Sequence, residues 1–337
     1  MKKITLLLLF TSFISFGQWS QLGSDIDGFA ANEQSATSIS LNSSGTILAV
    51  SAPRAMDNGV MKGKVRVFEW NGSSWIQKGT DIIGSSLGDA FCNSVTISAN
   101  GNVIIIGAPG SLSPDYLSAT GPTGYARIFE WNGSNWIQRG TDILGIAPND
   151  IAGNIVSINA DGTIIGINLP GFDGVNGANS GAIRVYDWNG SSWIQKGQNI
   201  EGQTNNNYLG SMALNTSGNT LAIGNASDNA GGSNAGTIKV YEFVGTTWIQ
   251  KGTNVNGNNL TLQGHGGILA IDASGNNFIT GGYSFTNGAI GYAKAYSWNG
   301  SNWVPKGQTL LSNIGSDFFG TSVDISGTFP KSDSSNK

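Results

Sequence analysis

The chain has 337 residues, of which 50 are glycine and only 11% are charged, and its formal net charge at pH 7 is −4. An apolar fraction of 39% is enough for a sizeable core, which excludes a wholly disordered chain. A mildly acidic chain without a basic stripe is a poor candidate for a nucleic-acid partner, so we expect none. Abundant glycine with few lysines and glutamates favours many short strands joined by tight turns.

The first 17 residues have the form of a secretory signal peptide. Lys2 and Lys3 precede a short apolar run that ends at Phe10, and small and polar residues follow. The run is too short to span a bilayer and no later stretch is longer, so we expect no membrane-spanning segment. We therefore expect cleavage near Gly17 and Gln18 and a secreted or cell-surface protein.

A ten-residue segment, Trp-Asn-Gly-Ser-Ser-Trp-Ile-Gln-Lys-Gly, organises the rest of the chain. It lies at residues 70–79 and recurs, with one weaker copy, at 131–140, 188–197, 243–252 and 298–307. The second half of an earlier copy stands at residues 19–23. The second tryptophan of each copy is 55 to 61 residues from the next, and self-similarity at such a period indicates a repeat architecture.

Each period contains four segments that resemble β-strands: an alternating run, a continuous apolar run, a strictly alternating run and the Trp-Ile-Gln-Lys-Gly segment. The Asn-Gly between the last two predicts a tight hairpin, because both residues tolerate positive φ. In the first copy this hairpin would pair Trp70 with Trp75 and place Glu69 diagonally opposite Lys78. Four antiparallel strands per period match one blade of a β-propeller.

We therefore predict an all-β propeller of four-stranded antiparallel blades over residues 18–326, followed by a polar tail at 327–337. The five complete repeats are expected near residues 35–79, 92–140, 153–197, 209–252 and 265–307. A partial blade strand stands at each end: residues 19–23 match a fourth strand and residues 319–326 a first strand. Two alternatives fit these ends, a natural five-bladed protein with extra fragments or a chain truncated relative to a larger propeller.

Two stretches of the second repeat resemble the FG-GAP repeat. They are residues 88–95, Gly-Asp-Ala-Phe-Cys-Asn-Ser-Val, and residues 104–109, Ile-Ile-Ile-Gly-Ala-Pro. Residues 317–323 match the first half of the motif and residues 48–53 the second half, whereas the other copies are degenerate. FG-GAP repeats build the propeller of integrin α-subunit heads and of many secreted bacterial proteins. The resemblance implies a propeller of typically seven blades that serves as an extracellular adhesion or ligand-binding module.

One departure from that family concerns calcium. In many members the loop between the first two strands carries several spaced aspartates that bind the ion. Here the corresponding loops, such as 98–102 and 159–163, carry at most one carboxylate each, and calcium wants six to eight oxygen ligands. Asp25 to Gly28 looks like part of a calcium loop, but its repeat counterparts at Asp81 and Asp142 mark the exit of a fourth strand. We expect no metal site and no cofactor.

The sequence also lacks an evident catalytic set. His265 is the sole histidine and occupies the repeat position of Phe91 and Phe319, which favours a packing role over Ser-His-Asp chemistry or metal binding. Cys92 is the sole cysteine, lies in an apolar alternating run and is expected in the core. We therefore expect no catalytic residues and no enzyme.

Two features leave a carbohydrate-active alternative open. Paired carboxylates of a glycosidase can be far apart in sequence. However, the acids at one strand position recur in four of the five blades, as Glu69, Glu130, Asp187 and Glu242, and a residue repeated from blade to blade serves the blade. The chain also has ten tryptophans, whose faces could stack on sugar rings, but nine belong to the repeated hairpin and favour structural packing.

The loops between the second and third strands vary while the strands repeat. In an up-and-down blade these loops and the blade-to-blade crossings emerge on one face, where binding residues concentrate. The candidate ligand contacts are Asp115, Tyr116, Phe172, Asp173, Tyr283 and Phe285. The alternative for these loops is that they are tolerated insertions without a binding role.

We predict a non-catalytic binding or adhesion module whose partner is an extracellular protein or glycan. The alternatives are a carbohydrate-active protein, either a lectin or a glycosidase-like propeller, and a truncated structural fragment of a larger surface protein.

Overall fold

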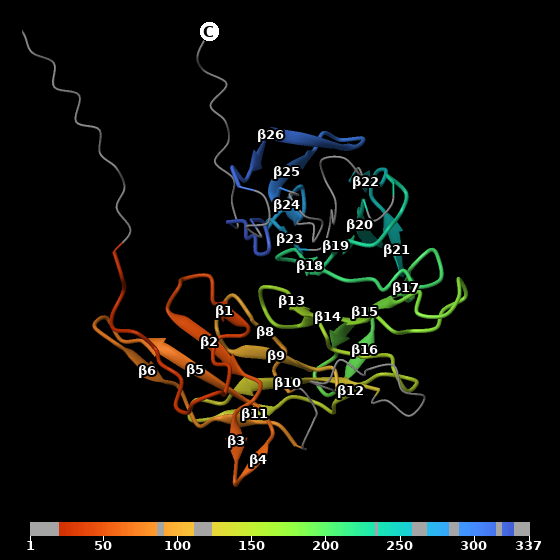
Figure 1. The fold of residues 1–337 in the computed structure, drawn as a ribbon. Helices are drawn as coiled ribbons and strands as arrows, with labels where there is room; N and C mark the ends of the chain where they lie inside the picture. The colour runs from red at the N-terminus through yellow and green to blue at the C-terminus, as the bar shows by residue number, and fades with distance from the viewer. Residues whose placement is uncertain are drawn as a thin grey trace, which may run out of the picture.

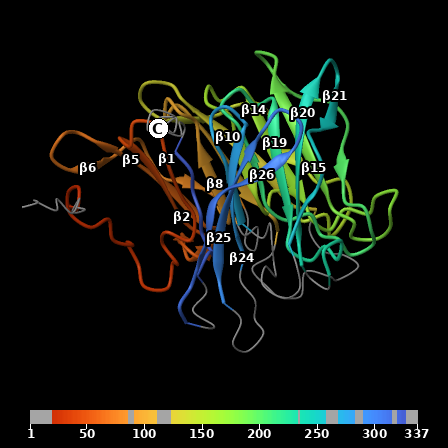
Figure 2. The ribbon, with the colours of Figure 1, turned by 90° about the horizontal axis from the view of Figure 1, so that it is seen from above.

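Five antiparallel sheets follow one another along the chain, and Figure 1 shows them in an arc coloured from red to blue. The structure is a computed structural model that describes residues 20–85, 91–110, 123–232, 235–257, 268–282, 290–314 and 319–326. Within these ranges no residue is helical, and none belongs to a helix that could cross a membrane. The second view, Figure 2, shows the sheets side by side.

The first four sheets have the same plan, in which four strands pair in chain order and a short fifth strand also pairs with the third. The first sheet consists of β1 (Ile39–Leu41), β2 (Ile47–Ala52), β5 (Lys64–Trp70), β6 (Trp75–Gln77) and β7 (Ile82–Ile83). A small hairpin of β3 (Met56–Asp57) and β4 (Val60–Met61) extends from its second connection. The second sheet consists of β8 (Ser94–Ile97), β9 (Val103–Ala108), β10 (Tyr125–Trp131), β11 (Trp136–Gln138) and β12 (Ile143–Leu144).

The remaining sheets continue the pattern. The third consists of β13 (Val156–Ile158), β14 (Ile164–Leu169), β15 (Ala182–Trp188), β16 (Trp193–Gln195) and β17 (Ile200–Glu201). The fourth consists of β18 (Met212–Leu214), β19 (Thr220–Asn225), β20 (Thr237–Val244), β21 (Thr247–Gln250) and β22 (Val255–Asn256). The fifth consists of β23 (Ile268–Ile271), β24 (Asn277–Gly282), β25 (Tyr292–Trp298) and β26 (Trp303–Leu311). The chain is a β-propeller of four-stranded antiparallel blades, as its period predicts.

The hydrophobic core lies between neighbouring sheets. Four clusters of buried side chains fill the four interfaces of the five sheets, and each draws residues from both sides. In the second interface, for example, Ile105 and Ile128 of one sheet pack with Ile165 and Ile167 of the next. The first strands β1, β8, β13, β18 and β23 contact one another in that order and form the inner edge of the arc.

The hairpin between the third and fourth strands forms with the predicted register. Trp70 pairs with Trp75, the two ring centroids lie 5.5 Å apart, and Lys78 Nζ lies 3.0 Å from Glu69 Oε2. The turn differs from the expectation that both residues of Asn-Gly take positive φ, because Gly72 alone does so, at 98°.

The Asn71 side chain closes this turn. Its Oδ1 accepts hydrogen bonds from the backbone N–H of Ser73 and of Ser74, both at 2.9 Å. An Asx turn of this kind satisfies the backbone through a side chain. The repeated Asn-Gly-Ser is therefore explained by the turn itself.

The second tryptophan of each hairpin ties its blade to the one before it. The Trp136 Nε1–H donates to the Lys78 carbonyl at 2.9 Å, and Gly79 lies against the rings of Trp131 and Trp136. The same bond joins Trp193 to Arg139, Trp248 to Lys196 and Trp303 to Lys251, at 2.8 to 2.9 Å. The tryptophans are thus structural, as their repeat pattern predicts.

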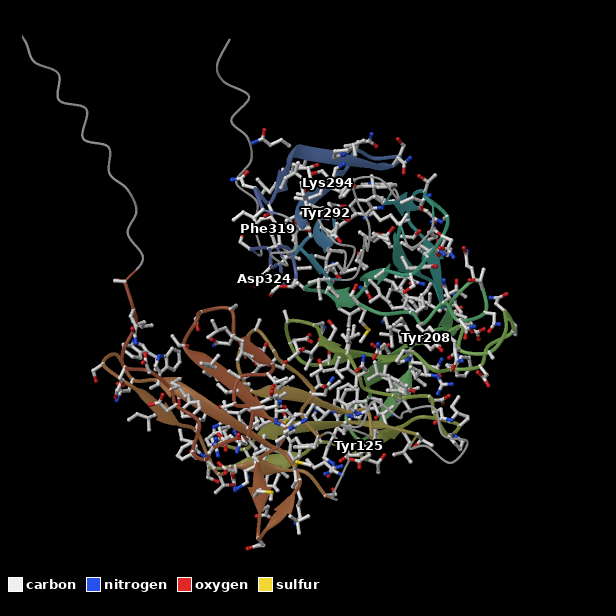
Figure 3. All side chains as sticks on the ribbon, viewed as in Figure 1. Tyr125, Tyr208, Tyr292, Lys294, Phe319 and Asp324 are labelled. Carbon is white, nitrogen blue, oxygen red and sulfur yellow. The ribbon has the colours of Figure 1, made fainter. Side chains whose placement is uncertain are left out.

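The two chain ends occupy blade-like places but form no β-ladder within the described residues. Residues 20–23 pack where a fourth strand of a preceding blade would lie, and residues 319–326 lead away from the fifth sheet as a first strand would. Figure 3 shows Phe319 and Asp324 beside that sheet, near Tyr292. Both segments were predicted as partial strands. Among the described residues, neither has a neighbouring strand with which its backbone pairs.

Cys92 is buried in the first inter-sheet cluster, as the sequence predicts. Its φ of 67° is left-handed, which matches Gly153 (83°) and Gly320 (87°) at the same repeat position. The thiol donates a hydrogen bond to the Lys64 carbonyl at 3.2 Å, and burial raises its pKa to about 12. A protonated, enclosed thiol is a poor nucleophile.

We expect the Cys92 thiol to resist a maleimide at pH 8 in the folded protein and to react once urea unfolds it. An unfolded cysteine has a pKa of about 8.5, so above that pH the unfolded state loses its proton while the folded state keeps it. The free energy of unfolding should therefore fall as the pH rises from about 9 toward 12, and less so in Cys92→Ala. Equal labelling rates with and without urea would contradict the buried position.

Candidate binding face

The loops between second and third strands meet the blade-to-blade crossings on one face of the arc. In the third blade, Asn176 Nδ2 donates to the Gly202 carbonyl at 2.8 Å, and the Asn206 N–H donates to the Ala178 carbonyl at 2.9 Å. The Tyr208 N–H likewise reaches the loop, and Figure 3 shows Tyr208 on the crossing toward the fourth blade. The described loops therefore converge as the up-and-down topology predicts.

Two of the six predicted contact residues, Phe172 and Asp173, lie in the described part of this face. Phe172 is half-buried against the second core cluster, with the Arg184 guanidinium carbon 5.8 Å from its ring centroid. Its backbone carbonyl accepts the Gly181 N–H at 3.0 Å. This geometry gives Phe172 a packing role.

Asp173 is exposed beside Phe172, but one of its oxygens is already engaged. Asp173 Oδ1 accepts the Asn179 N–H at 2.8 Å and so holds the loop in shape. The neighbouring Glu201 Oε2 accepts the Val175 N–H at 3.0 Å in the same way. Asp173 therefore combines a structural bond with a carboxylate that remains exposed to a ligand.

The other four predicted contacts, Asp115, Tyr116, Tyr283 and Phe285, lie outside the described residues, as does His265. The structure therefore brings Phe172 and Asp173 together on one loop and does not place the other four.

Two arginines near this face are neutralised by neighbouring acids. Arg127 makes a two-pronged contact with Asp142 at 2.6 and 2.7 Å, and Arg66 contacts Glu33 at 3.1 Å and Asp81 at 3.6 Å. Because both guanidinium groups are largely buried and already paired, they are not available to a large anionic ligand. The exposed side chains of the described loops include carboxylates and amides, and also Arg54 and the apolar Met56 and Val175.

A small enclosed cavity lies beneath the face in the fourth blade. It has a volume of about 10 Å³ and is lined by Asn207, Leu209, Ile223, Asn225, Asp228, Thr237 and Lys239. Burial lowers the pKa of Lys239, and the charge of Asp228 opposes that shift. The space suits about one water molecule and not a substrate.

A second, open cavity of about 230 Å³ lies on the opposite side, at the axis of the arc. Each blade contributes the last apolar residue of its first strand, namely Leu41, Ile97, Ile158, Leu214 and Ile271. Successive blades are joined around it by backbone bonds such as Ala99 N–H to the Ala160 carbonyl, at 2.9 Å. The described residues that line it include no charged side chain.

The loops that would hold calcium in FG-GAP proteins flank this axial cavity. Asn159 Oδ1 accepts the backbone N–H groups of Thr163 and Ile164, and Asp161 Oδ1 accepts the Thr163 hydroxyl at 2.6 Å. Asp272 has the same capping role in the fifth blade, through Asn276 and Asn277. The oxygens of these loops thus serve the turns, and the described residues hold no cluster of three or more potential metal ligands.

The sequence does not reveal that Glu33 and Phe29 build a cap on the first blade. Glu33 Oε1 accepts both the Phe29 N–H at 2.8 Å and the Arg66 guanidinium, and the Phe29 ring lies 3.8 Å from the guanidinium carbon. One signal was available: Gln21 and Asp25 repeat the spacing of Gln77 and Asp81. Aligning these pairs places Glu33 in the crossing position of Asp89 and Asp150.

Comparison with known proteins supports the fold and leaves the family open. No family model matches the sequence, and no curated protein matches it. The structure is similar to Kuenenia stuttgartiensis hydrazine synthase, with a TM-score of 0.53, 12% identity and coverage of 86% of this chain and 77% of that one. It is also similar to a putative 6-phosphogluconolactonase from Bacteroides fragilis, with a TM-score of 0.52, 12% identity and coverage of 82% and 84%. At such identity the likeness concerns the fold alone.

Proposed function

We propose that this propeller is a secreted or cell-surface binding module of the FG-GAP type, without catalytic activity of its own. The observation that carries the proposal is the convergence of unlike loops and crossings on one face of a repeated scaffold. Binding residues concentrate on such loops because the scaffold fixes their position while their sequence is free to vary. The apolar start of the chain supports export.

The partner in this proposal is an extracellular protein or glycan. The exposed carboxylates and amides of the described loops suit the hydroxyl and amide groups of such partners. Phe172 is left out of the proposed contact set because it is engaged in packing, whereas Asp173 remains in it.

The test is an array of glycans and matrix proteins probed with protein from Gln18 onward, with calcium and with a chelator. We expect a selective hit that persists in chelator. Asp173→Asn should raise its dissociation constant about fivefold, the equivalent of about 1 kcal/mol, while keeping the loop bond to Asn179.

The matched control is Asp161→Asn, which also keeps a capping oxygen but lies on the opposite face. It should leave the affinity unchanged. A ligand that both variants bind equally well would contradict the assignment of the loop face as the binding surface. Hydrolysis of a polysaccharide that stops when one acid is replaced would favour the carbohydrate-active alternative.

A further inference from the structure

The crossing from the third to the fourth blade, residues 203–208, has the same backbone frame as two other crossings of the described chain. Each begins after a glycine and folds around a buried side chain, which accepts the N–H of the first residue of the crossing. These capped pairs are Phe29 with Glu33 at 2.8 Å, Ile146 with Asp150 at 2.6 Å, and Gln203 with Asn207 at 3.3 Å. The residue before the buried cap is in each case an asparagine with left-handed φ, at 66°, 72° and 55°.

The three exposed positions between the glycine and that asparagine differ from crossing to crossing. They are Phe-Ala-Ala at residues 29–31, Ile-Ala-Pro at 146–148 and Gln-Thr-Asn at 203–205. Because the same frame forms around apolar residues, it does not require the polar ones. Within the described part of the chain, the side chains of Gln203, Thr204 and Asn205 make no hydrogen bond. Their donors and acceptors are therefore open to a ligand.

The long loop of the third blade holds this crossing in a fixed position. The Asn206 N–H donates to the Ala178 carbonyl at 2.9 Å, and Asn206 Oδ1 accepts the Asn179 side-chain amide at 3.2 Å. A Cβ atom at Gly177 would lie 3.1 Å from Asn205 Cβ, so glycine lets the two segments touch. Figure 3 shows Tyr208 at the end of the same crossing. A surface held in this way loses little conformational freedom when it binds.

The charge of the two segments indicates the class of ligand. Among residues 173–179 and 203–208, Asp173 is the one charged residue, and there is no lysine or arginine. The exposed side chains of Asn176, Asn205 and Asn206 carry amides, which donate and accept hydrogen bonds at once. Sugar hydroxyl groups do the same, so the two sets complement each other, whereas an anionic ligand would meet only the Asp173 carboxylate.

We propose that the third-blade amide patch, defined as Asp173, Val175, Asn176 and residues 203–206, binds a neutral oligosaccharide. The inference rests on the binding function proposed for the loop face and names the ligand class of that face. Amide and hydroxyl groups of residues 203–206 bind the sugar hydroxyls, and the exposed carboxylate oxygen of Asp173 accepts one of them.

The apolar content of the patch favours a sugar over a protein. Protein partners are held mainly by tryptophan, tyrosine and arginine anchors at the centre of an interface. The large apolar side chain of the patch is Val175, which is 91% exposed, and Tyr208 beside the patch is half-buried. One exposed apolar side chain among amides suits the C–H face of a single sugar ring.

The test titrates protein from Gln18 onward with neutral oligosaccharides of glucose, mannose, xylose and galactose, with galacturonate and sulfated oligosaccharides, and with collagen and fibronectin. We expect saturable binding of a neutral probe with the same dissociation constant at low and high salt, because no ion pair is formed. Replacing Gln203→Ile, Thr204→Ala and Asn205→Ala together should weaken it at least about tenfold. The fold should remain intact by circular dichroism, since Ile146, Ala147 and Ala31 occupy these positions in the other crossings.

The matched control is Thr246→Ala with Thr247→Ala at the outer hairpin of the fourth blade. These exposed hydroxyls also make no hydrogen bond within the described residues, and their loss should change the affinity less than about twofold. Selective binding of a protein or an acidic oligosaccharide, with no neutral probe bound, would overturn the inference and leave the proposed binding function standing. So would binding of a neutral probe that the triple change leaves intact. Absence of binding to every probe would contradict the binding function as well.

Discussion

Replacing Gly107 with alanine is expected to destabilise the protein by about 3 kcal/mol or more. Gly107 is the last residue but one of β9, where a Cβ atom would run into the carbonyl oxygen of Gly153 in the next blade and lie 3.2 Å from Val156 Cγ1. The obstacle is backbone, which the Gly153 N–H bond to the Asn168 carbonyl holds in place at 2.9 Å. Relief would require the third blade to move away from the second.

Gly166→Ala is the matched control for this change. Gly166 is also buried within a second strand, β14, but its Cβ would meet the Met212 sulfur at 3.3 Å, and a methionine side chain can shift by a few tenths of an ångström. Alanine also restricts the unfolded chain more than glycine does. We expect Gly166→Ala to stay within about 0.5 kcal/mol of the parent or to gain up to about 1 kcal/mol.

Urea unfolding followed by circular dichroism and by tryptophan fluorescence measures both variants. Coinciding transitions are needed, because blades of a repeat protein can unfold separately. Equal losses for the two alanines would show that blade spacing is not set by the close backbone approach at Gly107.

The architecture was predictable because its signals are local and recur. One hairpin with Trp, Asn, Gly and Trp at fixed positions, repeated every 55 to 61 residues, predicts the strand order and the pairing of Trp70 with Trp75. The turn geometry was not predictable from residue preferences alone, since Asn71 uses its side chain and not a positive φ. The interruption of the outer strand between β6 and β7 was likewise not predictable. It depends on the contact of Gly79 with the tryptophans of the next blade, which are at least 52 residues later in the sequence.

The candidate site was less predictable because its loops carry no repeat. Phe172 and Asp173 are adjacent in sequence and were both predicted as ligand contacts, yet Phe172 packs against the core, as an apolar side chain can, and only Asp173 is exposed. The Glu33 contact with Arg66 depends on a tertiary approach of the N-terminal crossing to β5.

Trp136→Ala is expected to cost about 3–5 kcal/mol, the range for removing a buried large aromatic side chain. The Trp136 ring is 6% exposed, lies 5.5 Å from the Trp131 ring and contacts Gly79 of the first blade. Trp136→Phe keeps an aromatic ring but removes the donor to the Lys78 carbonyl together with part of the buried indole. That change should cost about 1–3 kcal/mol. The free energy of unfolding in urea measures both.

Trp75→Phe tests whether the cost of losing this hydrogen bond depends on a complete sheet in the preceding blade. It removes the same bond, but to Leu22 in the N-terminal segment, which has no described sheet behind it. We expect a loss of less than half that of Trp136→Phe, with faster hydrogen exchange in residues 20–28 and little change elsewhere. If Trp75→Phe costs as much as Trp136→Phe, the N-terminal segment is as firmly integrated as a complete blade. A smaller loss would instead mean that the tryptophan couples blades only where a full sheet stands on both sides, and that the first blade is the loosely held edge of the propeller.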